Sequence, residues 1–483
     1  MPRLSWSSVS RRAFIAATGL GLAGIGAGAL SLNRLVVSGA GDTPRPWRLY
    51  LLDHLSNRVV MESGDGAAPP AVAVIGELDE LSGYASRFVY RKGEPIELYF
   101  PAPGDACSSH RDDGCVYGDR VALPSDGLQP GLYRCRYFVD DTAHEVMFSV
   151  VDPDRLPPVC LVYPSSTYQA YNKAGGENLY SVGTLETFHV SMLRPLGSPT
   201  WFHDPRHNHA HTLLASNHVD FFAIDSAELD AGSPMLDEVR LFVLAQHDEY
   251  WSWNMRDRIE RHLRRGRPLL CLSGNVMFWK VRFENDNVAV QKISPTPSAG
   301  ELETWTGKWS RILSEERTMG LAWRYGGYPV KREFETFADF QKNVVKGSLT
   351  HEAFERSDGI EVMAPEHPLF AGTGLGRHDV FGDEVELLSV EVDGAPIDQD
   401  NAVDRTRAPH APPEMNILAR AWSSKAHRIR SFGTLADFRF EGRGRVINVG
   451  TIGWVKAALH DDTVARVTSN AFSLLLDEPS SDS

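Results

Sequence analysis

Short apolar runs alternate with polar, glycine-bearing segments along the central part of the chain. Residues 239–245 (VRLFVLA) and 268–274 (PLLCLSG) are two such runs, and β-forming side chains are frequent in both. Between them, residues 254–266 (NMRDRIERHLRRG) carry an apolar residue at every fourth position among charges and end in glycine, which is typical of an amphipathic helix with a C-terminal stop. A strand, a helix and a second strand in this order predict a βαβ unit with parallel strands.

The same pattern extends to both sides of this unit. It predicts a buried strand at 159–164 (VCLVYP), a strand leading into a helix at 220–229 (DFFAIDSAEL), and a strand, turn and helix start at 444–459. Together these elements predict an α/β domain. Two segments rich in loop formers, 285–300 and 392–413, are expected to be surface insertions in that domain.

The first third of the chain has a different pattern. Its apolar runs, such as PIELYFPA and HEVMFSVVD, are separated by turns of Gly, Pro and Asp, which predicts a small β-sandwich. With 483 residues, 42% of them hydrophobic, the chain has the length of two domains and the composition of a folded protein. The expected parts are a leader at 1–44, the β-sandwich at 45–155, the α/β domain at 156–475 and a polar tail at 476–483.

The formal net charge of −14 narrows the range of partners. Binding to nucleic acid needs a basic face that neutralises phosphates, whereas the basic residues here are scattered or lie on the predicted helix at 256–265. We therefore expect no nucleic-acid partner.

The N-terminus has the pattern of a twin-arginine export signal. Residues 10–15 (SRRAFI) place two arginines directly before an apolar run, rich in Gly and Ala, that extends over 13–32. Small residues between 27 and 40 offer cleavage sites, and an uncleaved run of this length could instead anchor the protein in a membrane. The expected location is periplasmic or otherwise extracytoplasmic. Because this route exports folded proteins, often with a cofactor in place, it is compatible with a metal acquired in the cytoplasm.

Cysteine usage agrees with export. Cys107 and Cys115 bracket a polar loop, a spacing that suits a loop-closing disulfide in an oxidising compartment. Cys135, Cys160 and Cys271 lie in apolar runs and are expected to be buried, inert thiols. The absence of a CxxC pair argues against a cysteine zinc site.

Residues with chemical potential gather after two of the predicted strands. The segment 247–253 (HDEYWSW) directly follows the strand at 239–245, and open α/β sheets place ligands at the carboxyl ends of their strands. The segments 167–172 (TYQAYN) and 175–180 (GGENLY) follow the strand at 159–164, so all three could meet above the sheet. Two tyrosinates and one carboxylate would suit a hard trivalent ion such as ferric iron. The alternative is that the tyrosines pack with their hydroxyls hydrogen-bonded and that Trp251 and Trp253 only pack the start of the helix.

A second candidate is the histidine-rich segment 202–211 (FHDPRHNHAH). Its four imidazoles could bind zinc or copper if the chain brought them together, and otherwise the segment is a solvated loop, which is the interpretation we favour. A third candidate is Cys271 as a nucleophile. It lies inside a predicted strand and not in a Gly-x-Cys-x-Gly elbow, which argues against that role.

Taken together, eight segments resemble, in composition and order, the C-terminal domain in the large subunit of N,N-dimethylformamidase and of its uncharacterised relatives. The segments are TYQAYN, GGENLY, VSMLRP, HDEYWSW, LSGNVMFWKVR, HPLFAGTGL, FGDEVE and GRVINVGTIGW. The resemblance covers roughly residues 160–470. It implies a fold similar to class I glutamine amidotransferases, with a doubly wound, mostly parallel sheet preceded by β-rich modules.

The resemblance also implies a mononuclear iron, expected as ferric, held by two tyrosines and one glutamate. Carried over by motif, the glutamate is Glu249, and the tyrosines are Tyr171 of TYQAYN and Tyr180 of GGENLY, with Tyr168 as a competitor for the first. The metal would act as a Lewis acid and activate water for hydrolysis of the C–N bond of a small amide.

Three further residues are implied as catalytic. Glu384 would take the proton of the attacking water and pass it to the departing amine, with Asp383 and Glu386 as neighbours that could be confused with it. His247 and Asn275 would orient water or donate hydrogen bonds to the oxyanion. The expected partner is therefore a small-molecule amide. The formamidase also has a small subunit, for which this sequence offers no evidence, and the oligomeric state stays open.

Two other functions remain open at this point. The first is a non-catalytic exported module that binds glycan or another envelope component through exposed aromatic residues such as Trp201, Trp305 and Trp309. The second is a hydrolase or lyase of different chemistry that uses the same pocket without iron.

Overall fold

The structure is a computed structural model, and all the residues that it describes fall within Arg34–Ser483. The described residues are 36–38, 47–64, 73–74, 82–109, 114–139, 142–176, 178–179, 188–196, 201–285, 287–290, 295–327, 359–397, 401–421, 431–432 and 434–478. The predicted export signal and the residue Tyr180 lie outside them. Among the described residues, no helix combines the length and the apolar composition that crossing a membrane requires.

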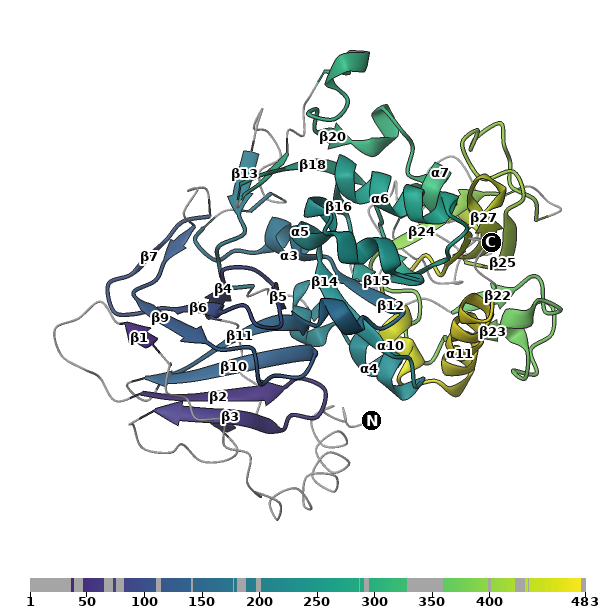
Figure 1. The fold of residues 1–483 in the computed structure, drawn as a ribbon. Coiled ribbons are helices and arrows are strands. Elements are labelled where there is room, and N and C mark those ends of the chain that lie inside the picture. The colour runs from purple at the N-terminus through teal and green to yellow at the C-terminus, as the bar shows by residue number, and fades with distance from the viewer. Residues whose placement is uncertain are drawn as a thin grey trace, which may run out of the picture. The chain divides into compact units, whose positions relative to one another are not determined.

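The first third of the chain forms two β-sheets. Their strands are β1 (Val36–Ser38), β2 (Trp47–Asp53), β3 (Val59–Gly64), β4 (Tyr84–Ala85), β5 (Val89–Arg91), β6 (Ile96–Phe100), β9 (Asp119–Leu123), β10 (Gly131–Val139) and β11 (Thr142–Val151). One sheet has the order β1-β9-β6-β4 and the other β3-β2-β10-β11-β5 (Figure 1). The ring of Phe100 in β6 stacks on Tyr137 in β10, with centroids 4.7 Å apart, so the two sheets pack through aromatic side chains. The β-rich character predicted for this region is confirmed.

The predicted disulfide is also confirmed. It joins Cys107 to Cys115 across a short hairpin of β7 (Ala106–Cys107) and β8 (Cys115–Val116). The remaining three cysteines are free and buried, as predicted, and burial raises the pKa of Cys271 well above its usual value. A protonated, enclosed thiol is a poor nucleophile, so the structure gives no support to the hypothesis of a cysteine enzyme.

A nine-stranded sheet forms the core of the rest of the chain. Its strands, in spatial order, are β14 (Phe221–Asp225), β12 (Val159–Tyr163), β15 (Leu241–His247), β17 (Leu269–Gly274), β28 (Arg445–Asn448), β27 (Leu435–Arg439), β25 (Asn416–Arg420), β22 (Ile360–Val362) and β23 (Val380–Phe381). The first five strands are parallel, and the last four continue the sheet in antiparallel pairs. The expected α/β class is therefore confirmed as a mixed sheet with several helices, while the closer likeness to glutamine amidotransferases stays a prediction.

Helices cover both faces of the parallel part of this sheet (Figure 1). They are α3 (Ser165–Tyr171), α4 (Ala210–Ser216), α5 (Ser226–Ala231), α6 (Trp253–Arg264), α7 (Glu316–Met319), α10 (Trp454–Ala458) and α11 (Asp462–Leu476). Successive residues of β15 point to opposite faces, so Val243 and Ala245 pack with residues of α4, α10 and α11, whereas Phe242 and Leu244 pack with residues of α5 and α6. Strands buried on both faces explain why the sequence reads as continuous apolar runs.

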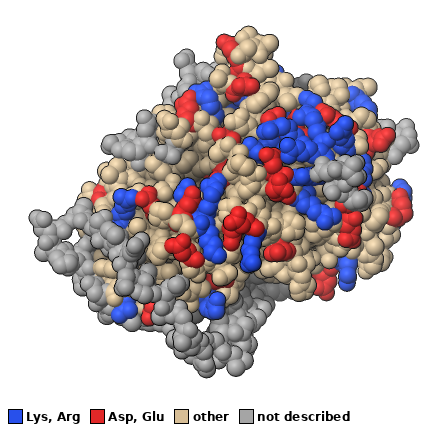
Figure 2. All heavy atoms as spheres, in the orientation of Figure 1, with Lys and Arg blue, Asp and Glu red and all other residues tan. Residues whose placement is uncertain are grey.

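The βαβ unit at the centre of the sequence forms as predicted, from β15 through α6 to β17. Its helix begins where the Ser252 hydroxyl accepts a hydrogen bond from the Met255 amide at 3.1 Å, and it ends just before Gly266, which has a φ of 80°. Figure 2 shows basic side chains gathered over this part of the surface, with acidic ones among them. Several pair with carboxylates at the surface, such as Arg261 with Asp257 at 2.8 Å.

Smaller sheets flank the main one and correct two predictions about loops. They contain β13 (Phe188–Ser191), β16 (Tyr250–Ser252), β18 (Trp279–Glu284), β19 (Asn287–Val290) and β20 (Gly307–Lys308), and separately β21 (Ala322–Gly327), β24 (Val392–Pro396) and β26 (Ser431–Phe432). The segments 285–300 and 392–413 were expected to be surface insertions, but all residues of β19 and β24 are buried. Both strands lie among loop-forming residues, so the local sequence does not predict them. Their burial depends on contacts with distant parts of the chain.

Candidate active site

The candidate site lies where the order of the parallel strands reverses. From β12 the chain crosses to β14 on one side and then returns to β15 on the other side of β12. Open α/β sheets bind ligands at such a switch point, outside the carboxyl ends of the two neighbouring strands. Here α3 follows β12, and the HDE segment follows β15. Thr167 of α3 joins the two, because its hydroxyl accepts hydrogen bonds from the amides of Glu249 (2.9 Å) and Tyr250 (3.1 Å).

Tyr171 and Glu249 meet at this point. The Tyr171 hydroxyl donates a hydrogen bond to Oε2 of Glu249 at 2.7 Å. Burial, and then the neighbouring carboxylate, raise the pKa of Tyr171 well above its usual value, so the phenol keeps its proton when no cation is near. Tyr168 is engaged elsewhere, since its hydroxyl donates to Oε1 of Gln246 at 2.7 Å and accepts from Asn208 at 3.1 Å. The geometry therefore favours Tyr171 over Tyr168 as the partner of Glu249.

His247 is the centre of a chain of polar contacts. Its Nε2 lies 3.3 Å from Nδ2 of Asn275 and 3.6 Å from Oε2 of Glu249, and its Nδ1 lies 2.8 Å from Nε2 of His203. Burial lowers the pKa of His247 to about 3, so the ring is neutral at pH 7. Oδ1 of Asn275 is buried and accepts no hydrogen bond from the described residues. A buried carbonyl oxygen without a donor is expected to bind water or a ligand.

His203 joins the site although the sequence analysis did not place it there. Its ring stacks on Tyr171 with centroids 3.8 Å apart and planes 20° apart, and only 3% of its surface is exposed. The favoured interpretation of 202–211 as a solvated loop is wrong for His203 and His211, which are both buried. The four histidines of this segment indicated a possible site, but no periodicity in the sequence predicted which of them would be buried.

Two backbone conformations shape the floor of the site. Gln246, at the end of β15, has a φ of 65°, and Asn275, directly after β17, has a φ of 53°, which few residues other than glycine adopt. Strained conformations of this kind concentrate at functional sites. The preceding residue, Gly274, allows the backbone of Glu391 to approach closely, because a Cβ there would lie 2.6 Å from the Glu391 carbonyl oxygen.

Buried acids lie next to the cluster. Asp248, between His247 and Glu249 in the sequence, is fully buried, and burial raises its pKa to about 8. Asp393 of β24 is equally buried, with its pKa raised to about 8 by burial, and its Oδ2 accepts a hydrogen bond from the amide of Val276 at 3.2 Å. The sequence analysis singled out neither residue, because adjacency to a candidate ligand does not tell which way a side chain points.

Other predicted residues do not join this cluster in the part of the chain that the structure describes. Glu384, Asp383 and Glu386 occupy exposed positions in the loop after β23, and no contact links them to the cluster among the described residues. Tyr180 lies outside the described residues, so its role stays a prediction. The structure thus brings together four of the six predicted site residues, and the role of each of the six remains a prediction.

The residues present fit part of an iron site. Phenolate and carboxylate oxygens are hard ligands that suit a trivalent ion. Oη of Tyr171 and Oε2 of Glu249 lie 2.7 Å apart, so both oxygens would be available to one cation bound between these side chains. Among the described residues, no group of three or more His, Cys, Asp or Glu side chains has the arrangement of a metal site. A site built on tyrosines with one carboxylate would not form such a group.

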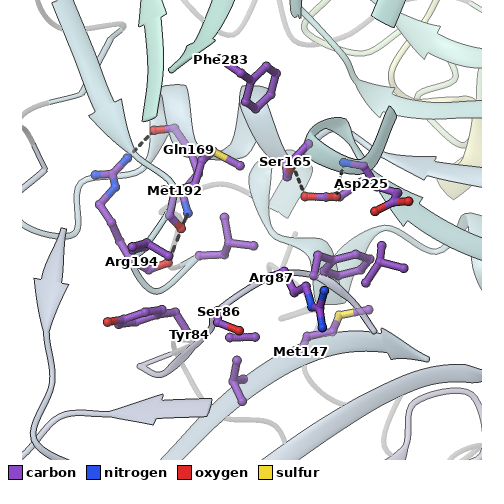
Figure 3. A pocket seen from close by; sticks show the side chains of 18 of the residues that line it. Tyr84, Ser86, Arg87, Met147, Ser165, Gln169, Met192, Arg194, Asp225 and Phe283 are labelled. Carbon is purple, nitrogen blue, oxygen red and sulfur yellow. Dashed lines mark hydrogen bonds between the residues drawn. The ribbon is translucent and has the colours of Figure 1, made fainter. Parts of the chain in front are cut away.

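A separate cavity of about 250 Å³ lies on another side of α3 (Figure 3). Ser165 and Gln169, one helical turn apart, line it, whereas Thr167 and Tyr171 of the same helix reach the HDE segment. Its polar wall includes the hydrogen bond from Ser165 to Asp225 at 2.8 Å. The helix therefore separates this cavity from the cluster around Glu249.

Comparison with known proteins assigns the chain to a family. The profile described as N,N-dimethylformamidase beta subunit-like, C-terminal, matches residues 105–464, which is roughly three quarters of the chain. The chain belongs to this family. The match confirms the resemblance and extends it beyond the expected range of 160–470 into the β-rich region that precedes the large sheet. No curated protein matches the chain.

Proposed function

We propose that this dimethylformamidase-like protein is an iron-dependent hydrolase that cleaves the C–N bond of small linear amides. The observation that carries the proposal is the convergence of Tyr171, Glu249, His247 and Asn275 at the switch point of the sheet. These residues come from three separate segments, TYQAYN, HDEYWSW and LSGNVMFWKVR, and each of these segments carries part of the resemblance to the family. Membership of the family supports an amidohydrolase-like relation.

Tyr171 and Glu249 would hold the metal, with Tyr180 as the expected third ligand. To bind a cation as a phenolate, Tyr171 must lose the proton that it donates in the hydrogen bond to Glu249. Ferric iron, when bound, supplies Lewis acidity that activates water and polarises the amide carbonyl. The stacked ring of His203 fixes the plane of Tyr171, and Thr167 fixes the backbone of Glu249.

His247 and Asn275 would act on the substrate. As a neutral imidazole, His247 can donate or accept one hydrogen bond at Nε2, depending on its tautomer, and this is the atom that faces Glu249 and Asn275. The Asn275 amide offers an N–H donor for the oxyanion that develops as water adds to the carbonyl carbon. Both side chains are buried, where hydrogen bonds to a developing charge are stronger than in water.

Proton transfer completes the proposed reaction. The oxygen of water forms a bond to the carbonyl carbon, the C–N bond breaks, and the amine departs with a proton that originates from the water. Glu384 is proposed to carry that proton, which requires the exposed loop after β23 to approach the cluster when substrate binds. The products are a carboxylic acid and an amine.

The alternative of a glycan-binding module loses its main support. Trp305 is 8% exposed and Trp309 is fully buried, so neither offers a surface on which a sugar could stack, and the side chain of Trp201 lies outside the described residues. Trp309 instead stacks on Trp253 in the core beside α6, with centroids 5.9 Å apart. The exposure that this alternative assumed for Trp305 and Trp309 is therefore wrong.

An exported location is part of the proposal. The disulfide between Cys107 and Cys115 supports an oxidising compartment, in agreement with the twin-arginine pattern of the sequence.

The proposal is tested by amine release. Protein reconstituted with ferric iron is incubated with formamide, N-methylformamide and N,N-dimethylformamide, and the free amine or ammonia is quantified. We expect release by the wild type and by the control Glu366→Gln, which changes an exposed glutamate, and no release above background by Glu249→Gln. Iron-loaded wild type that releases amine from none of these amides, or Glu249→Gln as active as the wild type, would overturn the proposal.

A further inference from the structure

Arg194 is a buried arginine whose partners are backbone carbonyl groups. Only 1% of its surface is exposed. It donates hydrogen bonds to the carbonyl oxygens of Ser191 (2.8 Å), Gln169 (2.6 Å), Ala174 (2.8 Å) and, at longer range, Asn172 (3.4 Å). No carboxylate among the described residues pairs with it. Burying a charge without a counter-ion costs free energy, so the hydrogen bonds of the guanidinium must offset that cost.

Three of these four carbonyls belong to the end of α3 and the turn after it. The last carbonyls of a helix have no partner within the helix, and a cation near that end is favourable. α3 has only seven residues, too few to be stable by itself in water. The guanidinium therefore supplies donors to carbonyl groups at the end of α3, where, among the described residues, the backbone provides only the Asn172 amide for the Gln169 carbonyl.

The exchange between the two segments is reciprocal. Nε2 of Gln169 donates to the carbonyl oxygen of Arg194 at 3.2 Å, and Nδ2 of Asn172 donates to that of Pro195 at 2.5 Å (Figure 3 shows the contacts of Gln169 and Arg194). Asn172 also accepts a hydrogen bond from the amide of Ala174 at 2.9 Å. Side chains of each segment thus hold the backbone of the other.

Tyr171 lies between two residues that contact the segment 191–195. Gln169 precedes it by two positions, Asn172 follows it, and the Asn178 side chain donates to its carbonyl oxygen at 2.9 Å. We infer that Arg194 is a positioning residue, which fixes the backbone around Tyr171 so that its hydroxyl meets Glu249. This inference rests on the proposed function for its link to iron, but the clamp itself is defined by contacts within the chain.

Lysine could not replace arginine in this role. The guanidinium presents five N–H donors in a rigid plane and reaches carbonyls on several sides, whereas an ammonium group offers three donors at one point. Arg194→Lys keeps the positive charge and removes the planar set of N–H donors. Arg405 provides a control, because this exposed arginine also donates to backbone carbonyls, at 2.8 Å to Ala411 and 2.7 Å to Pro412, in a loop that has no contact with α3 among the described residues.

The first measurement is hydrogen exchange of metal-free protein by mass spectrometry. In Arg194→Lys we expect the amides of residues 172–176 to exchange at least about tenfold faster than in the wild type, while Arg405→Lys leaves them unchanged. The second is iron affinity, by competition with a chelator well below the unfolding temperature. Here Arg194→Lys is expected to weaken binding by about tenfold or more and to alter the tyrosinate absorption, which a loss of stability alone would not do in a folded protein.

Wild-type exchange at 172–176 together with wild-type iron affinity in Arg194→Lys would overturn the inference. If Arg194→Lys does not fold, Asn172→Ala removes the side-chain hydrogen bond from α3 to the carbonyl of Pro195. Unchanged hydrogen exchange of the amides of 174–176 in that variant would also overturn the inference. If the wild type binds no iron, the proposed function fails, yet the exchange experiment still decides whether Arg194 holds this segment.

Discussion

Acid should destabilise the fold through buried histidines, and His211 allows the effect to be measured in isolation. His211 is 3% exposed, its Nδ1 lies 3.1 Å from the Tyr163 hydroxyl, and its ring lies 4.3 Å from that of His54. Burial first, and then the positive charge that His209 could carry, lower its pKa from 6.5 to about 3. Between pH 6.5 and about 3, the His211 ring is therefore protonated in the unfolded chain and neutral in the folded protein.

The sign and size of the effect follow from this difference. The contribution of His211 to stability is complete above pH 6.5 and is lost as the pH falls below 6.5, down to about 3. At pH 5.5, one unit below the unfolded value, the loss is roughly 1.4 kcal/mol. Other groups titrate in the same range, and buried acids such as Asp393 act in the opposite direction because their pKa is raised. The total pH dependence is therefore not diagnostic, and a variant is required.

Urea unfolding of the wild type and of His211→Gln at pH 7.5 and pH 5.5 isolates the contribution. The free energy of unfolding of the variant, relative to the wild type, should rise by about 1.4 kcal/mol between the two pH values, whatever the difference at pH 7.5. A relative stability that is the same at both pH values would refute the reasoning, since it would mean that His211 is protonated equally in the folded and unfolded states.

Three further predictions concern the disulfide, the core and the proposed proton carrier. Exchange of both Cys107 and Cys115 for serine should lower the unfolding free energy by roughly 2–3 kcal/mol in calorimetry or urea titration, and an unchanged stability would show that closing this short loop contributes nothing. Leu270→Ala, in fully buried β17, should cost about 2–5 kcal/mol, and a loss below 1 kcal/mol would contradict the close packing of helices on this face. Glu384→Gln should reduce kcat roughly 100-fold or more with iron content unchanged, while the control Glu386→Gln keeps wild-type activity; equal activity of the two variants would remove Glu384 from the mechanism.

The parts of the fold that the sequence predicts are those in which local pattern and tertiary burial agree. The run 239–245 and the helix that follows it carry their own periodicity, so β15 and α6 form where expected, with shifts of about two residues at their ends. The segments TYQAYN and HDEYWSW could meet according to the sequence, and they do so because the parallel strands that they follow are neighbours in the sheet.

What the sequence does not predict depends on contacts between distant segments. The strand at 392–396 (VDGAP) contains glycine, proline and aspartate, yet it is buried beside β21 and β26, and its Asp393 reaches the amide of Val276. The side chain of His203 is buried because its ring stacks on Tyr171 and its Nε2 forms a hydrogen bond with Nδ1 of His247. The burial of this strand and that of His203 are not reflected in any periodic pattern of the local sequence.

The most direct test of the account is the metal content and visible spectrum of the purified protein, measured for the wild type, Tyr171→Phe and the matched control Tyr168→Phe. Tyr168 is a buried tyrosine of the same helix, whose hydroxyl bonds Gln246 and Asn208 and not Glu249. The account predicts about one iron per chain and a tyrosinate absorption band that weakens in Tyr171→Phe and persists in Tyr168→Phe. Wild-type protein that stays colourless and binds no iron when ferric iron is supplied, or a band that Tyr171→Phe leaves unaltered, would contradict it.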